Sequence, residues 1–471
     1  MRGVWGRFSA ITRAICAARW PSVLAEFVAL SVVLYATRLV SLNIWLVPQG
    51  DVREYYQYAQ AFWLQRPLFH TLPVEYPPLS ILPFSLTLLP PAPDTSLVFA
   101  LWMLVVVLAG YTGFLLFSTR RRAVIYIVYL VLGAAATILA RYDIVPALIT
   151  LAALWAAERR RFTLSYALLA AGILLKLYPA FVVPVVALEH WRALRLDTPD
   201  RIAPSPSQPL RTRWREYLRL DASRWVARGL AFCAGLVVAG FVGAAILDST
   251  GAFSLFGYAG ERPIQIESLP ATILWLGTII GIPARVNYSF TSLNYVGTLD
   301  PLLRPLSALA LAGGCLWVYW RQARGRLDVA RAFLAAMAVV LVTNKIFSPQ
   351  YVIWILPVVA YVEGFDLLWL AIAVLTTYDF PIIYQSQHPI EHVPFSWQFM
   401  PVVALRNGLL LWVTVRAIVR STQREDQTLW TIATADGEIQ AADGIRRTHP
   451  GSEMPGLDAT GRVGHATSPR S

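Results

Sequence analysis

Short polar motifs interrupt the long apolar runs of this chain, and they carry the residues that could do chemistry. The first is Gly50-Asp51, which Glu54 and Tyr55 follow at helical spacing. The Asp51 carboxylate can cap the helix that begins there, and it can also take a proton as a general base. The two roles are compatible in one residue, and the sequence leaves both open.

Later motifs bring carboxylates, amides and cations together with aromatic residues or prolines. Each has a plain structural alternative, because two prolines make a stiff corner and a neighbouring Arg/Asp pair can satisfy itself. As binding groups, the polar and aromatic members of these motifs are candidates for contact with a substrate. They are Glu54, Tyr55, Glu75, Tyr76, Arg141, Asp143, Lys176, Arg262, Gln265, Glu267, Lys345 and Gln350.

Lysine usage sets two of these cations apart. Of the 40 basic residues only two are lysine, Lys176 and Lys345, and both lie in the motifs. Arginine serves everywhere else, so a compact ammonium at two sites indicates a point-charge contact, for example with a phosphate oxygen. The alternative is that both lysines snorkel toward the membrane surface.

His388, Glu391 and His392 match the H-x-x-E-H pattern of one class of zinc protease. Zinc binding needs both histidines on one helical face and a further ligand. The motif instead lies in a short segment rich in Pro and Gln, and no further Glu ligand is obvious. We therefore expect no metal site, and we place His388 and His392 at the entrance for an acceptor.

The elements that position these motifs must be membrane helices. The chain is 56% hydrophobic and only 14% charged, with a mean hydropathy of +0.53, which is too apolar for a soluble domain. Apolar runs near the length of about 20 residues that a membrane helix needs recur between short charged or Pro/Gly-rich turns. The sequence therefore predicts an all-α polytopic membrane protein.

Arginine clusters set the predicted orientation. They hold 26 arginines, near the N-terminus and at residues 120–122, 159–161, 192–228, 321–331 and 416–424. The opposite loops hold only eight basic residues, so the excess is a topology signal and not a nucleic-acid surface. By the positive-inside rule, the chain crosses the cell membrane about twelve times, with both ends in the cytoplasm and the polar motifs on the outer face.

Domain boundaries follow from this threading. Residues 1–22 are a basic cytoplasmic N-terminus, and residues 23–420 are the transmembrane domain. Residues 421–471 are a polar tail without apolar periodicity, which predicts a disordered cytoplasmic segment. The outer loops cover about residues 46–94, 248–302 and 385–400, and the large basic cytoplasmic loop covers about residues 191–228.

Three outer segments are predicted to touch the membrane without crossing it. Residues 79–90 form too short an apolar run, and counting them as a span would put the 120–122 arginines outside. Residues 268–282 form a partial or re-entrant segment. The helix from Asp51 carries an apolar stripe at i, i+3, i+4 and i+7 that is typical of an interfacial helix. Broken segments at membrane depth usually line a cavity.

In order and spacing, the motifs resemble those of glycosyltransferase family 87, the polyprenol-phosphate-mannose-dependent mannosyltransferases of the glycosyltransferase-C superfamily. The resemblance covers about residues 25–420 and includes Phe347-Ser348-Pro349-Gln350-Tyr351 with Trp354 and Pro357. It implies a glycosyltransferase-C-like fold. It also implies a hexosyltransferase of cell envelope biosynthesis that moves a sugar, by default mannose, from a polyprenyl-phosphate donor to a lipid or glycan acceptor, without a cofactor.

The resemblance further implies an inverting displacement in which an acidic residue of the first outer loop is the base. Asp51 matches that position. The base must be ionised, so it needs water or a cation beside it, and Arg53 does not face Asp51 at i, i+2. The candidates for holding the leaving lipid phosphate are the outer cations Arg141, Lys176, Arg262 and Lys345.

Other interpretations stay open. A secondary transporter or flippase of a lipid-linked sugar would also have about twelve spans with broken helices, although no two-half repeat is visible. A polysaccharide ligase or polymerase would use a lipid-diphosphate donor. A non-catalytic scaffold would leave Asp51 and the two lysines unexplained. The motifs decide neither the sugar nor the acceptor.

Overall fold

A computed structural model gives the fold for most of the apolar part of the chain. The chain divides into two units, Met1–Ser421 and Thr422–Ser471, and every described residue belongs to the first. The described residues are 24, 26–36, 50–63, 72–73, 75–196, 221–249, 251–386, 393–394 and 397–420. The predictions for the N-terminus, the tail, the middle of the basic loop, His388 and His392 lie outside these residues.

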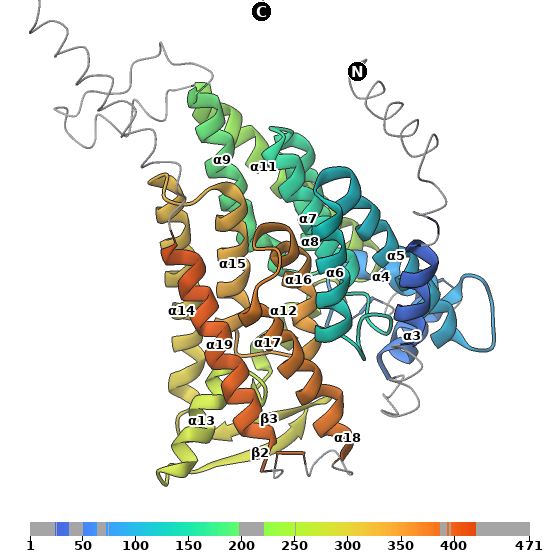
Figure 1. The fold of residues 1–471 in the computed structure, drawn as a ribbon, viewed down its shortest axis with the longest axis vertical. Coiled ribbons are helices and arrows are strands. Elements are labelled where there is room, and N and C mark those ends of the chain that lie inside the picture. Colours follow the sequence, from blue (N-terminus) through green and yellow to red (C-terminus); the bar gives the residue numbers. More distant parts are fainter. Residues whose placement is uncertain are drawn as a thin grey trace, which may run out of the picture. The chain divides into compact units, whose positions relative to one another are not determined.

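The described residues are mainly helical (Figure 1). The first helices are α3 (Gly50–Trp63), α4 (Ile81–Ser85), α5 (Thr95–Phe117), α6 (Arg120–Gly133), α7 (Ile144–Glu158), α8 (Phe162–Leu175) and α9 (Val183–Leu196). The later ones are α11 (Asp221–Leu247), α12 (Gly251–Glu261), α13 (Leu269–Ile279), α14 (Asp300–Ala323), α15 (Val329–Thr343), α16 (Val352–Val362), α17 (Leu367–Thr377), α18 (Tyr384–Ser386) and α19 (Phe399–Val419). Short helical turns are η1 (Pro78–Ser80), η2 (Leu86–Leu88), η3 (Tyr178–Val182), η4 (Pro349–Tyr351) and η5 (Tyr378–Ile383).

Four of the described helices are long and apolar enough to cross a membrane. Several others, including α7, α8 and α15, are apolar but have only 10–17 residues. At 1.5 Å per residue, such helices fall short of the roughly 30 Å of a bilayer core. The helices are those of an α-helical membrane protein, as the composition predicts, while the number of twelve crossings stays a prediction. The four long helices are Thr95–Phe117, Ser223–Leu247, Asp300–Ala323 and Phe399–Val419.

The connections between helices alternate between two ends of the bundle. α7 begins beside Asp143 and ends beside Arg159, so these two turns lie at opposite ends of one helix. At the Arg-rich end, the Tyr361 hydroxyl donates a hydrogen bond to Glu158 (2.5 Å), and the Arg122 guanidinium lies 5.4 Å from the centre of the Tyr361 ring. The arginine clusters at 120–122 and 159–161 therefore lie at the end of α7 opposite Asp143.

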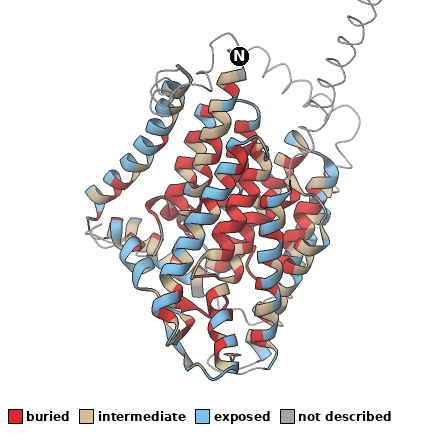
Figure 2. Cartoon of the chain, turned by 90° about the vertical axis from the view of Figure 1, so that its left-hand side faces the viewer, coloured by how far each residue is buried: buried red, intermediate tan, exposed pale blue. Residues whose placement is uncertain are grey.

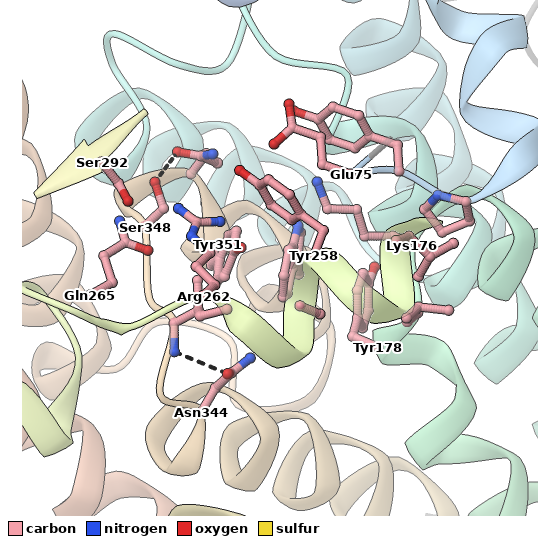
Figure 3. A pocket seen from close by; sticks show the side chains of 18 of the residues that line it. Glu75, Lys176, Tyr178, Tyr258, Arg262, Gln265, Ser292, Asn344, Ser348 and Tyr351 are labelled. Atoms are coloured by element: carbon pink, nitrogen blue, oxygen red, sulfur yellow. Dashed lines mark hydrogen bonds between the residues drawn. The ribbon is translucent and has the colours of Figure 1, made fainter. Parts of the chain in front are cut away.

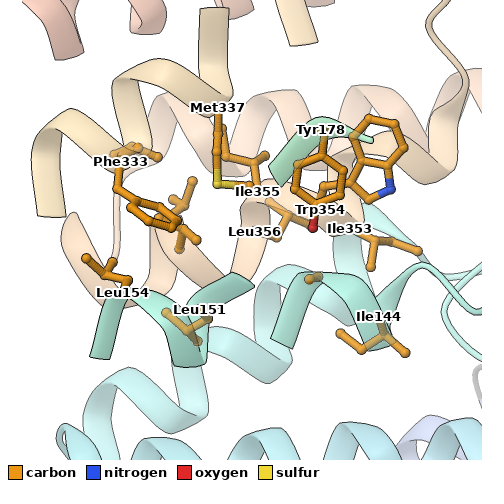
Figure 4. Close-up of a cluster of buried hydrophobic side chains, with 14 of the residues drawn as sticks. Ile144, Leu151, Leu154, Tyr178, Phe333, Met337, Ile353, Trp354, Ile355 and Leu356 are labelled. Carbon is orange, nitrogen blue, oxygen red and sulfur yellow. The ribbon is translucent and has the colours of Figure 1, made fainter. Parts of the chain in front are cut away.

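The centre of the bundle is formed by α7, α15 and α16. Helix α15 is buried on all sides from Ala332 to Val342, which is typical of a core helix. Leu151, Phe333 and Ile355 are fully buried where the three helices meet (Figures 2 and 4). Between membrane helices such side chains stabilise the bundle by van der Waals packing, because lipid tails are as apolar as the side chains themselves. This packing holds the ends of α7 and α16 in place under the polar motifs.

The apolar stripe predicted in residues 52–63 is present on α3, but it packs against protein. The Tyr55 ring stacks on Phe84 with ring centres 4.1 Å apart, and meets the edge of Tyr142 at 5.7 Å. Residues 78–88 form only η1, α4 and η2, which confirms that this run is not a continuous spanning helix. The aromatic contacts hold Asp51, at the start of α3, close to the turn before α7.

Part of the long outer loop is not helical, and this is an element that the all-α prediction did not include. It contains a three-stranded antiparallel sheet in the order β1 (Ile264–Gln265), β3 (Ser292–Gly297), β2 (Ala284–Ser289). In Figure 1 this sheet lies near α13. Phe290 and Thr291 have positive φ angles of 54° and 52° and make the tight turn between β2 and β3. The predicted partial segment is the short helix α13, which Ser268 caps by accepting from the Ala271 amide at 3.3 Å.

Candidate functional site

The polar motifs surround one cavity of about 410 Å³ (Figure 3). Its wall is formed by the start of α3, the turns before η1 and α7, the turn after α8, helix α12, strand β1 and the turn between α15 and α16. Side chains that are far apart in sequence thus share one cavity, as the sequence predicts. The predicted site residues in the wall are Asp51, Glu54, Glu75, Tyr76, Arg141, Lys176, Arg262, Gln265, Lys345 and Gln350.

Asp51 lies in the first turn of α3, where a carboxylate is stabilised by the helix dipole. It forms an ion pair with Arg141, and the two side chains are 24% and 22% exposed. The cation that a carboxylate base needs beside it is therefore Arg141, while Arg53 is exposed. Burial lowers the pKa of the Arg141 guanidinium to about 10, which leaves it charged at neutral pH.

Lys176 in the cavity wall forms a second ion pair with Asp143, which lies behind the wall. The Lys176 ammonium lies 3.3 Å from Asp143, which also accepts a hydrogen bond from the Trp354 indole at 2.6 Å. The ammonium further lies 4.9 Å from the centre of the Tyr76 ring and 4.8 Å from that of Tyr142. Burial lowers the pKa of Lys176, and the charge of Asp143 opposes that shift. The alternative that Arg141 and Asp143 satisfy each other does not hold, because Arg141 pairs with Asp51 and Asp143 pairs with Lys176.

Lys345 and Arg262 differ in how their charges are satisfied. The Lys345 ammonium donates to the carbonyls of Gly260 (3.0 Å) and Arg262 (2.7 Å), at the C-terminal end of α12 where a cation is favourable. Within the described residues, the Arg262 Nε has no hydrogen-bond partner, and its guanidinium lies 5.8 Å from the centre of the Tyr258 ring. Lys345 thus fixes the backbone that carries Arg262, and Arg262 presents its charge to the cavity.

Two further carboxylates, Glu54 and Glu75, lie on the Asp51 side of the cavity. Burial raises the pKa of Glu54, and the nearby charge of Glu75 raises it further. The cavity wall therefore holds three carboxylates, Asp51, Glu54 and Glu75, together with four cations. Such a wall suits one ligand that offers a hydroxyl and another that carries an anion.

Three predicted site residues lie outside the cavity wall. Tyr55 and Asp143 support it from behind through the contacts described above. Glu267 is 1% exposed and accepts a hydrogen bond from the Tyr384 hydroxyl at 2.6 Å, in a buried cluster with Asp379 and Arg406. Burial, and then the charge of Asp379, raise the pKa of Glu267 to about 8. Tyr55, Asp143 and Glu267 thus do not line the cavity, although each is close in sequence to a residue that does.

The cavity also has lining residues that the sequence did not single out as substrate contacts. They are aromatic or uncharged polar side chains, and several belong to motifs already named for their neighbours. Two of them, Thr291 and Ser292, belong to the β2–β3 hairpin. The alternation of apolar residues across 286–295, interrupted by a short turn, could have predicted that hairpin. The residues are Tyr178, Tyr258, Thr291, Ser292, Asn344, Ser348, Tyr351 and Trp354.

Metal ligands are not grouped in the part of the chain that the structure describes, where no cluster of three or more His, Cys, Asp or Glu side chains could hold an ion. His388 and His392 lie outside that part. Comparison with protein-family models, with curated proteins and with solved structures finds no match for the chain. The family resemblance therefore rests on the sequence motifs alone.

Replacement of Lys176 by Met should destabilise the fold by about 3–5 kcal/mol, because it leaves the Asp143 carboxylate buried without its cation. Asp143 is only 1% exposed, and Lys176 is 13% exposed. The double variant Lys176→Met, Asp143→Asn should recover part of that loss, since the amide still accepts from Trp354. Unfolding of the purified protein in detergent measures both. A single variant as stable as the exposed-site control Arg285→Met would contradict the buried pair.

Proposed function

We propose that this chain is a membrane glycosyltransferase that moves a sugar, mannose by family default, from a polyprenyl-phosphate donor to a lipid or glycan acceptor. The observation that carries the proposal is one cavity that holds a carboxylate paired with a cation, Asp51 with Arg141, together with a guanidinium that has no carboxylate partner among the described residues, Arg262. A base and an anion site in one cavity are the two parts that sugar transfer from a lipid phosphate needs.

Arg262 is the best candidate for the phosphate among the four cations. Arg141 and Lys176 face carboxylates, and Lys345 donates to two backbone carbonyls. A phosphate bound at any of these three would have to displace an existing partner. Arg262 would instead gain a partner for a guanidinium that is already partly removed from water, and Arg binds phosphate with two parallel hydrogen bonds.

An apolar part of the cavity wall supports a lipid donor. Phe181, Leu255, Leu311 and Val340 line the cavity from η3, α12, α14 and α15. On α14, which carries the wall residue Leu311, Leu309 is 68% exposed on the outside of the bundle. A polyprenyl tail can leave the cavity along such a surface into the bilayer while its phosphate stays near Arg262.

The proposed reaction is a single displacement. Asp51 takes the proton of the acceptor hydroxyl as the hydroxyl oxygen attacks the anomeric carbon of the sugar. The bond between that carbon and the phosphate oxygen breaks, and the electron pair leaves with polyprenyl phosphate. Arg262 stabilises the additional negative charge on the phosphate, which is greatest in the transition state. Attack opposite the leaving group inverts the configuration at the anomeric carbon.

The same cavity could serve a transporter or flippase of a lipid-linked sugar, and a donor assay separates the two. Membranes that carry the chain receive polyprenyl-phosphate mannose labelled in the sugar. Label in a new covalent product supports the enzyme. Saturable movement of intact donor across the membrane without such a product would replace the enzyme by a transporter.

Sidedness is part of the proposal, with the cavity on the outer face of the cell membrane and both ends of the chain in the cytoplasm. A periplasmic reporter inserted in the turn that holds Lys345 should be active, and the same reporter in the turn after α14, at Gly325, should be silent. This follows from the excess of arginine at the second end. The reverse pattern would place Asp51 in the cytoplasm and remove the proposed mechanism.

A further inference from the structure

The small sheet presents one apolar face and one polar face. Ile264 precedes Gln265 in β1 and Ile266 directly follows the strand, while Leu293 and Tyr295 flank Asn294 in β3; the four apolar side chains share a buried cluster. Because strand residues alternate between faces, Gln265 and Asn294 point to the opposite side. The register confirms the pairing, with Gln265 directly opposite Asn294. The polar face of the sheet is therefore turned toward the cavity, whose wall includes Gln265 and Ser292.

Gln265 is buried without having its amide oxygen satisfied. The residue is 6% exposed, and its Oε1 has no hydrogen-bond partner among the described residues. Its backbone is fixed on two sides, because β1 pairs with β3 and the backbone N–H of Gln265 donates to the Lys345 carbonyl at 3.0 Å. A buried amide without a partner costs about 1–3 kcal/mol, so a rigid one at the wall of a cavity points to a ligand.

The surroundings of Gln265 in the cavity include several uncharged polar side chains. Ser348 donates to the Gln350 Oε1 at 2.5 Å, and Ser292 donates to Asn294 at 3.2 Å. Figure 3 labels Gln265, Ser292 and Ser348 in one part of the cavity, on the other side from Glu75 and Lys176. Amides and hydroxyls can both donate and accept, which matches the hydroxyl groups of a neutral sugar.

We propose that this polar face, with Gln265 at its centre, is the subsite for the sugar of the donor and determines which sugar is accepted. The inference rests on the proposed function, since Arg262, three residues before Gln265, would hold the phosphate to which that sugar is attached. In this arrangement the neutral side chains of the sheet bind the sugar hydroxyls. The charged side chains of the cavity bind the phosphate and take the acceptor proton. A site built to bond hydroxyl groups rejects ligands that lack them.

The test is the binding of bare and glycosylated lipids to the purified full chain. The probes are polyprenyl phosphate and its esters with mannose and with arabinose. Wild type should bind one of the two esters, which carry the same charge, more tightly than the other. Gln265→Met keeps the length of the side chain and removes its amide. The ratio of affinities that defines this preference should fall about tenfold, which corresponds to one hydrogen bond near the upper end of the usual energy range. Its affinity for polyprenyl phosphate should not change.

Gln322→Met is the matched control, because Gln322 is also buried, at 4% exposed, and its amide oxygen also has no partner among the described residues, but Gln322 does not line the cavity. It should keep the full preference. If Gln265→Met does not fold, Ser292→Ala should lose about threefold of the preference. An unchanged preference in either folded cavity variant would overturn the subsite, as would a wild type that binds the two esters equally. A wild type that binds none of the three lipids contradicts the proposed function instead.

Discussion

Asp51→Asn should abolish sugar transfer and leave the fold intact. An amide cannot take the acceptor proton, and the loss of a general base lowers a rate by about 10²–10⁴-fold. The amide has the same shape, and at 24% exposure the side chain is partly solvated, so the change should have little effect on stability. Transfer of labelled sugar from polyprenyl-phosphate mannose, with thermal unfolding of the same preparation, measures both.

The chain offers a matched control for this variant. Asp300 also lies in the first turn of a helix, α14, and also pairs with an arginine, Arg304, at 2.6 Å. It does not line the cavity. Asp300→Asn therefore makes the same chemical change outside the site, and its transfer rate should stay near that of wild type. Equal losses in the two variants would mean that the effect is structural.

Arg262→Gln should lower turnover by about 10²–10³-fold, the usual loss when one group that stabilises developing negative charge is removed. It should also weaken inhibition by the product analogue polyprenyl phosphate, because the same guanidinium binds the phosphate in the ground state. Arg285→Gln is the control, since Arg285 is an exposed arginine of the same outer region on β2. Kinetics with the labelled donor, with and without polyprenyl phosphate, measure these effects.

Arg262→Lys separates charge from geometry. If Arg262 binds the phosphate with two parallel hydrogen bonds, a lysine restores the charge but only part of the rate. Full activity of Arg262→Gln would exclude Arg262 as the phosphate ligand. The phosphate would then have to displace Asp51 from Arg141 or Asp143 from Lys176.

Much of the cavity wall could be predicted from the sequence, because polar residues in an apolar chain are few and stand at helix ends. The alternation of arginine clusters with polar motifs put Asp51, Lys176 and Lys345 at one end, and the structure brings all three to one cavity. Periodicity also identified α3, whose stripe was visible in the spacing of Val52, Tyr55 and Ala59. Each of these residues is buried in the structure.

Pairing between side chains could not be predicted in the same way. Arg141 and Asp143 are neighbours in sequence, yet Arg141 pairs with Asp51 and Asp143 pairs with Lys176. Residues two apart at the start of a helix point in different directions, so the partner is decided by which other turn packs alongside. That depends on how α3 and the end of α8 meet the turn before α7, which local sequence does not encode.

The sheet was missed for a different reason. Residues 284–297 contain polar residues on one face and only short apolar alternation on the other, and their turn residues, Phe290 and Thr291, are not the Asn or Gly that usually mark a tight hairpin. The Phe290 ring packs against Tyr258 with centres 5.3 Å apart, and such tertiary contacts offset the cost of the turn. From sequence alone the segment is therefore predicted as a loop, because its contact with α12 is not visible there.

The most direct measurement uses the purified chain in liposomes with polyprenyl-phosphate mannose labelled in the sugar and a membrane lipid extract as the source of acceptor. Wild type should form a labelled product and release polyprenyl phosphate in equal amounts, and Asp51→Asn should form neither above background. Product formation by Asp51→Asn at the wild-type rate would contradict the proposed base. Movement of intact donor by wild type without release of polyprenyl phosphate would contradict glycosyl transfer itself.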